Sequence, residues 1–475
     1  MRLCKHASHL HRGAALAALL VLAGCASFSP DGGLIGVNDI TGPALGQNAV
    51  TLRTPEDAQT ARARVKALLR QPLSADRAAQ IALLNNRALQ AAYNALGLSE
   101  AAMVQASLPP NPTVKLERIA GAGAVEVESR VVGSLLALVT LPARAEIAAD
   151  RFRQAQLQAA AETLRTATEA RRAFYRAVAA RSLASFLEQA RETGETAAQL
   201  AQRLGETGAM NKLDQARNQV FSAELVAQVA SARQRASSER ERLVRALGLW
   251  GDDLGFKLPA QLPPLPRIRS LASVEVEAVR RRIDLQIARI EVALLARSYG
   301  LTGATRFVSL LDVSGISKKT RENGESTRES GFEVEFQIPL FDFGEVKVRQ
   351  AEEAYLQAVN RLTAKAVNVR SEAREAYQAY RGAYDIARHY RREVLPLRKI
   401  ISDETLLRYN AMQIDVFALL AEARQRIAST SAAIEAEREF WLAETNLGAA
   451  LLGGNASPSD TTASAAAAPE SAGGH

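Results

Sequence analysis

The stretch Gly331–Gln350 has the sequence GFEVEFQIPLFDFGEVKVRQ, and its hydrophobic period changes in the middle. Before Pro339 an apolar set alternates with a polar set, namely Phe332, Val334, Phe336 and Ile338 with Glu333, Glu335 and Gln337. A period of two predicts a strand with one apolar face and one wet face. After Gly344 the apolar residues recur every three or four positions, which predicts a long helix. Pro339, Asp342 and Gly344 form the predicted strand-to-helix turn, because proline cannot donate to a strand ladder.

The composition of the chain favours helices. The chain has 475 residues, a formal net charge of +8 and a sequence pI near 9.6. Ala, Leu, Gln, Glu and Arg dominate long tracts, which is typical of helical bundles and coiled coils. Part of the positive charge lies at the N-terminus and the rest is scattered, so the charge does not indicate a nucleic-acid partner.

Residues 1–24 have the pattern of a secretory signal peptide, with a basic start followed by a short apolar run. The run ends in Leu22-Ala23-Gly24-Cys25, which resembles a bacterial lipobox. In that interpretation Cys25 becomes the acylated first residue of the mature chain, with palmitate as an expected acyl group, and anchors it to outer-membrane lipid. The alternative is an ordinary signal peptide with a chance cysteine. The other cysteine, Cys4, lies in the leader, so no disulfide is expected.

The rest of the chain divides into predicted segments. We expect a lipidated N-terminal segment at 25–73 with loop followed by a helix at 57–69, a first repeat at 74–250, a Pro-rich linker at 251–272, a second repeat at 273–452 and a disordered tail at 453–475. The first repeat is predicted to contain helix 74–105, strand 113–119, loop 120–130, strand 131–141 and helices 144–204 and 212–249. The second repeat is predicted to contain helix 274–299, strand 305–316, a charged loop at 318–329, strand 330–338 and helices 344–408 and 413–451.

Landmarks that recur about 200 residues apart indicate the duplication. Pro142, at the predicted end of a strand, is matched by Pro339, and Leu213-Asp214 is matched by Ile414-Asp415. Ala209-Met210 is matched by Ala411-Met412. The matches come in the same order, so we interpret the chain as two copies of one unit.

Two strands in each repeat give four per chain, which are too few to close a barrel, and open sheet edges cannot face lipid. Several chains would therefore pool their strands. Helices of about 60 residues are too long for one compact domain to bury, so they are expected to lie side by side. The predicted fold class is mainly α with a small membrane β-barrel portion, built from long antiparallel helical hairpins.

The chain resembles the TolC family of outer-membrane efflux channels over nearly all of 74–452. The resemblance rests on the duplication, on Asn111-Pro112, and above all on the turn from Ile338 to Gly344. Gly208 and Asn410, each followed by Ala-Met, look like the family's helix-hairpin tips. The first repeat departs from the family at 140–144, where a Phe and a Gly are often found. Asn410 stands where glycine is usual, and asparagine tolerates the left-handed conformation.

The resemblance implies a homotrimer, with a trimeric twelve-stranded barrel in the outer membrane and a periplasmic helical tunnel (α-barrel). It also implies a periplasmic adaptor (membrane fusion) protein and an inner-membrane pump as partners. The function would be that of a passive exit duct of a tripartite efflux or type I secretion system. The alternatives are a periplasmic coiled-coil adaptor and a structural spacer lipoprotein. The exported substrate and the pump class, of RND, ABC or MFS type, stay open.

Several residues have two interpretations. Glu333, Glu335 and Gln337 line the pore in a barrel, whereas in an ordinary sheet they form a solvated face. Asp214 and Asp415 form a carboxylate gate at the periplasmic mouth in one interpretation and cap helix N-termini in the other. Pro396 either simply kinks its helix or bends the hairpin inward to narrow the tunnel.

The sequence offers little for catalysis. The mature chain has two histidines, His389 and His475, and no cysteine besides Cys25, so no metal site is expected. No Gly-rich phosphate loop follows a predicted strand, and no nucleophile motif stands out. We therefore predict a protein that is not an enzyme and needs no cofactor.

Overall fold

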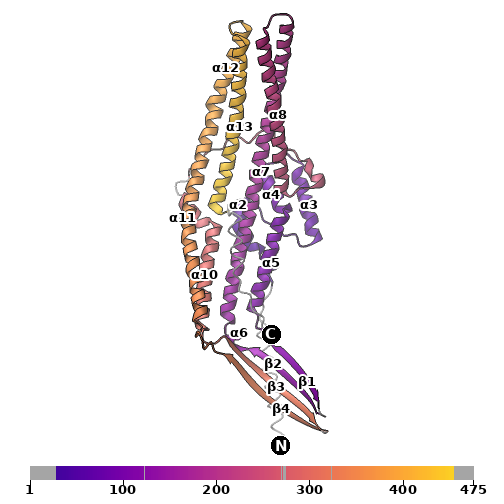
Figure 1. Ribbon diagram of the computed structural model, residues 1–475, viewed down its shortest axis with the longest axis vertical. Helices are drawn as coiled ribbons and strands as arrows, with labels where there is room; N and C mark the ends of the chain where they lie inside the picture. The colour runs from indigo at the N-terminus through magenta and orange to yellow at the C-terminus, as the bar shows by residue number, and fades with distance from the viewer. Residues whose placement is uncertain (1–27, 122–123, 269, 271–273, 323, 454–475) are drawn as a thin grey trace. The chain divides into compact units, whose positions relative to one another are not determined.

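The computed structural model describes residues 28–121, 124–268, 270, 274–322 and 324–453. The predicted signal peptide, Cys25 and the tail beyond 453 lie outside the described residues. The chain forms two compact units (Figure 1). In the described part of the chain, unit 1 comprises residues 28–37, 93–159 and 285–365, and unit 2 comprises residues 38–92, 160–284 and 366–453.

Unit 1 contains the strands. In the described residues they form one four-stranded antiparallel sheet in the order β1-β2-β3-β4 (Figure 1). The strands are β1 Thr113–Gly121, β2 Ala124–Ser134, β3 Leu310–Glu322 and β4 Glu325–Gln337. Every residue of the edge strands β1 and β4 is exposed, so the described residues leave both faces of the sheet uncovered at these strands.

Parts of long helices complete unit 1. They belong to α2 Leu34–Leu45, α5 Arg87–Ser107, α7 Leu141–Glu206, α10 Ile283–Ala304 and α11 Glu345–His389, and the short α6 Leu135–Val139 follows β2. Arg297 of α10 forms an ion pair with Asp150 of α7. Ser29, just before α2, donates from its backbone N–H to the carboxylate of Glu100 at 2.7 Å, which ties the N-terminal segment to α5.

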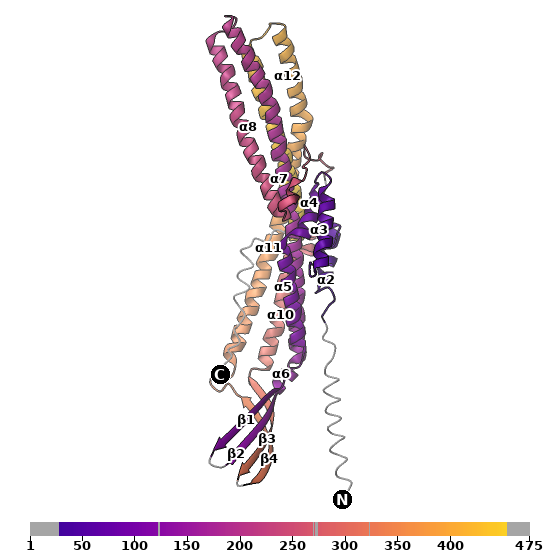
Figure 2. The ribbon, with the colours of Figure 1, turned by 90° about the vertical axis from the view of Figure 1, so that its right-hand side faces the viewer.

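Unit 2 contains the helical hairpins. Its further elements are α3 Pro55–Leu69, α4 Ala75–Asn85, α8 Lys212–Leu247, the 3-10 turn Gly251–Gly255, α9 Val274–Arg281, a π-turn Tyr390–Val394, α12 Leu395–Asn410 and α13 Val416–Leu452. Figure 2 shows α7 with α8 as one hairpin, and Figure 1 shows α12 with α13 as the other. Its core is built around fully buried aromatic side chains, among them Phe174, Tyr380 and Phe440. Tyr175 stacks on Trp441 with ring centroids 5.1 Å apart.

The helices α8 and α13 of unit 2 meet through residues about 200 positions apart. Arg235 pairs with Glu435 at 2.7 Å, and Arg424 pairs with Glu224 at 3.1 Å. The element order strand, strand, long helix, helix occurs twice along the chain, once from β1 to α8 and once from β3 to α13, as the landmarks in the sequence indicate.

The predictions for 26–56 and 74–105 are wrong in detail. The N-terminal loop contains α2, and the single helix is two helices, α4 and α5, with the extended residue Asn86 between them. The side chain of Asn86 accepts a hydrogen bond from the N–H of Ala88 at 2.9 Å, so it caps α5 as it ends α4. Asparagine can do both because its short side chain competes with the helix backbone.

The loops predicted at 120–130 and 318–329 are wrong, since β2, β3 and β4 occupy most of those residues. Val125 and Val127 alternate with Glu126 and Glu128, which is the period of a strand. The strand predicted at 131–141 is also wrong beyond Ser134, where α6 begins. Ser134 caps this short helix, with its side chain accepting from the N–H of Ala137.

The helix predicted at 344–408 is interrupted by the π-turn Tyr390–Val394. There the N–H of Leu395 donates to the carbonyl of Tyr390, five residues back. Pro396 has no N–H, and in a regular helix its ring would clash with the carbonyl four residues earlier. A wider turn just before Pro396 gives the ring room.

Candidate functional site

One face of the sheet in unit 1 is polar, and we call it the polar face. The strand register places on it Glu117, Glu126, Glu128, Arg130, Asp312, Lys318, Glu333, Glu335 and Gln337. The three residues predicted to line a pore therefore lie together on this face. Sequence reasoning missed their partners on β2 and β3, although the alternation of Val125–Glu128 carried the signal.

Ion pairs cross the strands on the polar face. Arg130 of β2 pairs with Glu333 of β4 at 2.7 Å and with Glu128 at 3.0 Å. Lys318 of β3 pairs with Glu126 of β2 at 2.7 Å. Glu335, in contrast, stands opposite the acidic Asp312. The face thus carries both signs of charge with an acidic pair at the end near the helices.

The opposite face, which we call the apolar face, exposes large hydrophobic side chains. Phe332 is 83% exposed, and its neighbours Val334 and Phe336 on β4 are also exposed. The register adds Val114, Val131, Leu311 and Val313 to this face. Several large hydrophobic side chains exposed side by side indicate contact with a partner or a membrane.

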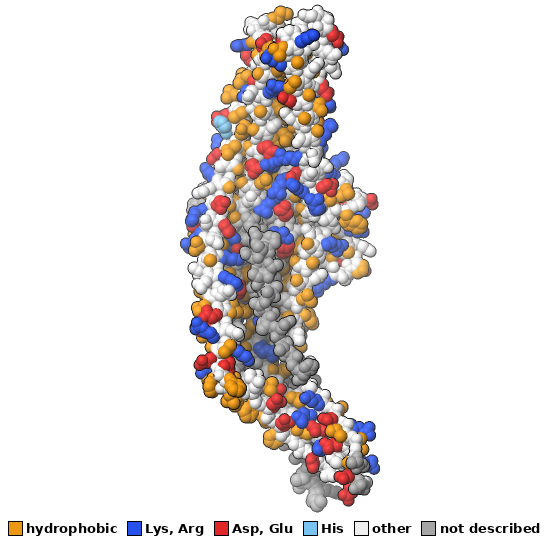
Figure 3. Space-filling model, viewed as in Figure 1, with side chains coloured by type: hydrophobic (Ala, Val, Ile, Leu, Met, Phe, Trp, Pro, Cys, Tyr) orange, Lys and Arg blue, Asp and Glu red, His pale blue; other side chains and the backbone are white. Residues whose placement is uncertain are grey.

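The predicted turn from β4 into α11 has an unusual backbone. Phe343 and Gly344 both have positive φ angles, of 48° and 73°. Asp342 accepts a hydrogen bond from the N–H of Gly344 at 3.1 Å, and its carbonyl accepts from Glu345 at 2.8 Å. Leu340, Phe341 and Phe343 are exposed, and Figure 3 shows hydrophobic side chains gathered where strands and helices of unit 1 meet.

Pro142 does not occupy a corresponding turn, so its prediction as a strand-to-helix turn is corrected. Strand β2 ends at Ser134, α6 follows, and Pro142 lies in the first turn of α7. Proline suits that position because the first N–H groups of a helix have no partner within it. The first repeat therefore joins strand to helix through α6 in place of an Asp-Phe-Gly turn.

The first hairpin tip lies between α7 and α8. Gly208 has a φ of 76°, and the N–H of Ala209 donates to the carbonyl of Leu204 at 2.8 Å, which closes α7. Asn211 caps α8, accepting from the N–H of Asp214 at 2.9 Å. The Asp214 carboxylate in turn accepts from the Asn211 side-chain amide at 2.8 Å.

The second tip, between α12 and α13, has the same geometry with different residues. Its left-handed residue is Met412, with a φ of 56°, whereas Asn410 is the last residue of α12. The expectation that Asn410 provides the left-handed turn is therefore wrong. Asp415 is the N-cap of α13 and accepts from the N–H of Ala418 at 2.9 Å.

The two tips show that Asp214 and Asp415 are not equivalent. In each tip two residues separate the left-handed residue from the cap, so Gly208 corresponds to Met412 and Asn211 to Asp415. Asp214 lies one turn further along its helix. Both carboxylates are near helix N-termini, but only Asp415 caps one.

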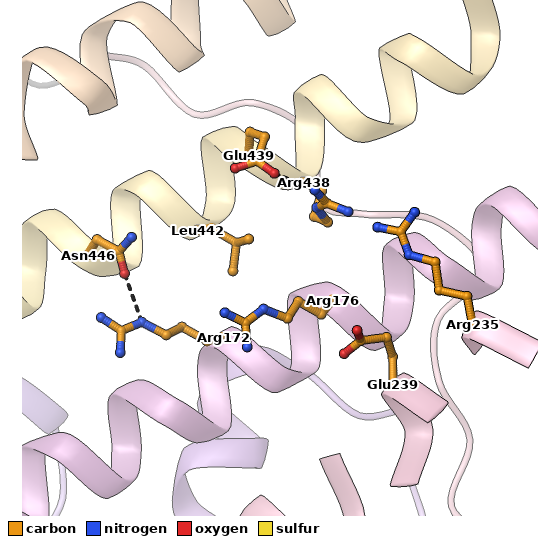
Figure 4. A pocket seen from close by; sticks show the side chains of 8 residues that line it. All are labelled: Arg172, Arg176, Arg235, Glu239, Arg438, Glu439, Leu442 and Asn446. Atoms are coloured by element: carbon orange, nitrogen blue, oxygen red, sulfur yellow. Dashed lines mark hydrogen bonds and ion pairs between the residues drawn. The ribbon is translucent and has the colours of Figure 1, made fainter. Parts of the chain in front are cut away.

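A cavity of about 390 Å³ in unit 2 is lined mainly by charged side chains of α7, α8 and α13 (Figure 4). Its lining consists of Arg172, Arg176, Arg235, Glu239, Arg438, Glu439, Leu442 and Asn446. Arg172 donates to Asn446 at 2.8 Å, and burial lowers the pKa of Arg172. Arg235 and Arg438 both pair with Glu435. The arginines are thus compensated by neighbouring glutamates, which favours a structural role.

Within the described ranges, no group of three or more His, Cys, Asp or Glu side chains is placed to hold a metal ion. None of the helices in the part of the chain that the structure describes is long and apolar enough to cross a membrane.

Comparisons with known proteins agree with the fold. Residues 275–402 match the family model "Outer membrane efflux protein". The structure is similar to that of CusC, with 15% identity, a TM-score of 0.67 and coverage of 82% of this chain and 91% of that one. It is also similar to VceC from Vibrio cholerae, at 13% identity, a TM-score of 0.66 and coverage of 83% and 98%. No curated protein sequence matches the chain.

A third similar structure is the open state of the MtrE outer membrane channel from Neisseria gonorrhoeae. It shares 15% identity, with a TM-score of 0.65 and coverage of 80% of this chain and 88% of that one. At such identities the likeness establishes the fold, which is that of outer-membrane channels. The chain therefore has the fold of outer-membrane channels, and residues 275–402 of its second half match the outer membrane efflux protein model. The resemblance indicated by the sequence is confirmed.

Proposed function

We propose that the chain is an outer-membrane efflux channel, the passive exit duct of a tripartite efflux or type I secretion system. Three copies, each with a four-stranded sheet, would form a twelve-stranded barrel. The helical hairpins would form the tunnel across the periplasm. A periplasmic adaptor would bind the hairpin tips and connect the duct to an inner-membrane pump.

The observation that carries this proposal is the division of the sheet into a polar and an apolar face that are both uncovered. An isolated sheet with both faces open is poorly stable in water. In a barrel formed by several copies, the apolar face meets lipid and the polar face lines the pore, including Glu333, Glu335 and Gln337. Pairing β1 with β4 of a neighbouring copy would also remove both open edges.

Electron microscopy of the full chain, extracted from membranes in detergent, tests the proposal. We expect negative-stain averages with three-fold symmetry and a central hole. Compact monomers would favour a periplasmic adaptor, and solid rods without a hole would favour a structural spacer. Conductance in a planar bilayer then separates an open duct from a spacer.

Lipid anchoring at Cys25 is a separate part of the proposal and rests on the Leu22–Cys25 sequence. Cells fed labelled palmitate are expected to incorporate the label into the protein. The variant Cys25→Ala should lose the label. Equal labelling of Cys25→Ala and the unchanged chain would contradict acylation at this residue.

A further inference from the structure

The apolar face of the sheet carries positively charged side chains near its hairpin ends. Arg118 of β1, Lys319 of β3 and Arg328 of β4 lie in one row across it, with Val127 of β2 between the first two. Arg321 lies in the next row. All four cationic side chains are exposed. We call these residues, Arg118, Lys319, Arg321 and Arg328, the cation row.

The cation row has no acidic neighbours on its own face. In the described strands, every Asp and Glu lies on the polar face, namely Glu117, Glu126, Glu128, Asp312, Glu322, Glu325, Glu329, Glu333 and Glu335. Lys318 and Arg130, the neighbouring cations on the polar face, are ion-paired there. None of the cation row forms an ion pair within the described residues. Positive charge without local compensation is complementary to an anionic partner.

The position of the cation row along the strands fits a membrane surface. On the apolar face, rows of large hydrophobic residues near the helices give way to a row containing Ser129, Ser317 and Ser330, and the cation row follows. From Leu311 to Lys319 the strand extends roughly 26 Å, which at a barrel tilt rises about 20 Å. Long cationic side chains reach a few ångströms further, so their charges come to the edge of an apolar band about 25 Å tall.

We propose that the cation row binds the phosphate groups of lipid A, the phosphorylated glycolipid of the outer leaflet. This inference rests on the proposed function, which puts the hairpin ends at the outer surface. Arginine binds phosphate oxygens through two parallel hydrogen bonds, and Arg118 and Arg328 stand at the two edge strands. In a barrel of several copies these edges adjoin, so their cations come together around one headgroup. Val127 between the cations offers apolar contact to an acyl chain.

Lipid binding by the full-length protein tests the inference. The variant Arg118→Gln with Lys319→Gln removes two charges from the apolar face. The matched variant Lys115→Gln with Lys318→Gln removes two charges from the same strands on the polar face. Binding is measured by native mass spectrometry of detergent-purified protein with diphosphoryl lipid A, dephosphorylated lipid A, phosphatidylglycerol and inorganic phosphate as probes.

We expect the unchanged protein to prefer diphosphoryl lipid A over the other three probes. Arg118→Gln with Lys319→Gln should weaken that binding about five-fold for each cation removed, because a basic residue at a membrane surface contributes about this factor. The matched variant should bind as the unchanged protein does. Equal losses in both variants, no loss in either, or equal binding of dephosphorylated lipid A or phosphatidylglycerol would overturn the inference.

The conductance of the same preparations keeps this inference apart from the proposed function. Both variants should conduct, since neither removes a residue of the turn or the tips; the matched variant changes charges on the proposed pore lining, so only the presence of conductance, and not its ion selectivity, is compared. If the unchanged protein conducts but Arg118→Gln with Lys319→Gln binds lipid A as tightly as the unchanged protein does, only the present inference fails. If the unchanged protein does not conduct in a planar bilayer, the channel proposal fails whatever the lipid result.

Discussion

At the scale of single residues, Gly344 is the position that least tolerates a side chain. A Cβ there would lie 2.3 Å from the carbonyl oxygen of Arg306, and the backbone has a φ of 73°. Gly344→Ala is therefore expected to destabilise the protein by at least about 2 kcal/mol, from left-handed strain and from displaced backbone. Thermal unfolding followed by circular dichroism measures the effect.

The helix that follows Gly344, α11, offers a control for Gly344→Ala. Gly382 lies inside α11, and a Cβ there would meet nothing within 4 Å. Gly382→Ala should raise stability by roughly 0.5–1 kcal/mol, because alanine loses less backbone entropy in a helix. If both alanine variants unfold at the same temperature as the unchanged protein, the backbone of Gly344 does not lie as close to Arg306 as the structure has it.

Glu437 of α13 makes stability depend on pH. Burial raises the pKa of this carboxyl group, and Arg391 at 3.9 Å offsets the rise only in part. Because the folded state holds the proton more tightly than the unfolded state, this group's contribution to stability falls as pH rises through its folded pKa. Glu437→Gln should therefore raise the unfolding temperature at pH 7 and leave it nearly unchanged at pH 4.

A second glutamate controls for the loss of charge at Glu437. Glu241 of α8 is exposed, so Glu241→Gln should change the unfolding temperature little at either pH. If Glu437→Gln raises the unfolding temperature as much at pH 4 as at pH 7, ionisation of the buried carboxyl group is not the cause of the rise.

At the scale of elements, the tips allow capping and gating to be separated. Asp415→Ser keeps a side-chain cap for α13 while removing the charge, and Asp214→Asn keeps a hydrogen-bonding partner for Asn211. If carboxylates hold the mouth closed, the neutral, capped double variant should conduct more in a planar bilayer than the unchanged protein. Asp415→Ala alone should lower stability by about 1 kcal/mol through the lost cap.

The gate hypothesis has a clear contrary outcome. If Asp214→Asn with Asp415→Ser conducts like the unchanged protein while Asp415→Ala is less stable, these carboxylates serve the helix ends alone. The non-equivalence of Asp214 and Asp415 in the two tips makes this comparison necessary. A ring built from both would be uneven, because only Asp415 sits at the cap position.

The long helices could be predicted from sequence because their pattern persists over many turns, so errors at single positions do not matter. The strands were harder. The segments 124–130 and 318–329 are rich in charged residues, which suggested loops. In 124–130 the alternation of valine with glutamate was the stronger signal, and it predicts a strand. The run Leu135–Val139 is apolar throughout, so its period cannot distinguish a strand from a helix, and the Ser134 cap decides it.

At the scale of the whole molecule, part of the candidate site could be predicted and part could not. The polar face was predictable within one strand, since Glu333, Glu335 and Gln337 alternate with apolar residues. The pair of Arg130 with Glu333 was not, because it joins residues 203 positions apart and depends on how β2, β3 and β4 align. Pairing between strands from different repeats leaves no local pattern in the sequence.

The two faces of the sheet lead to a prediction about ion selectivity. If the polar face lines the pore, Glu333→Gln with Glu335→Gln should lower the preference for cations over anions. Negative side chains that line a pore attract passing cations and repel anions at short range. Reversal potentials in asymmetric KCl measure this preference. Arg118→Gln with Lys319→Gln, on the apolar face, is the control and should leave the potential unchanged, since lipid would surround those side chains. The opposite result, a shift for the cation pair and none for the glutamates, would mean that the apolar face turns toward the lumen, and the barrel would have to be built the other way round.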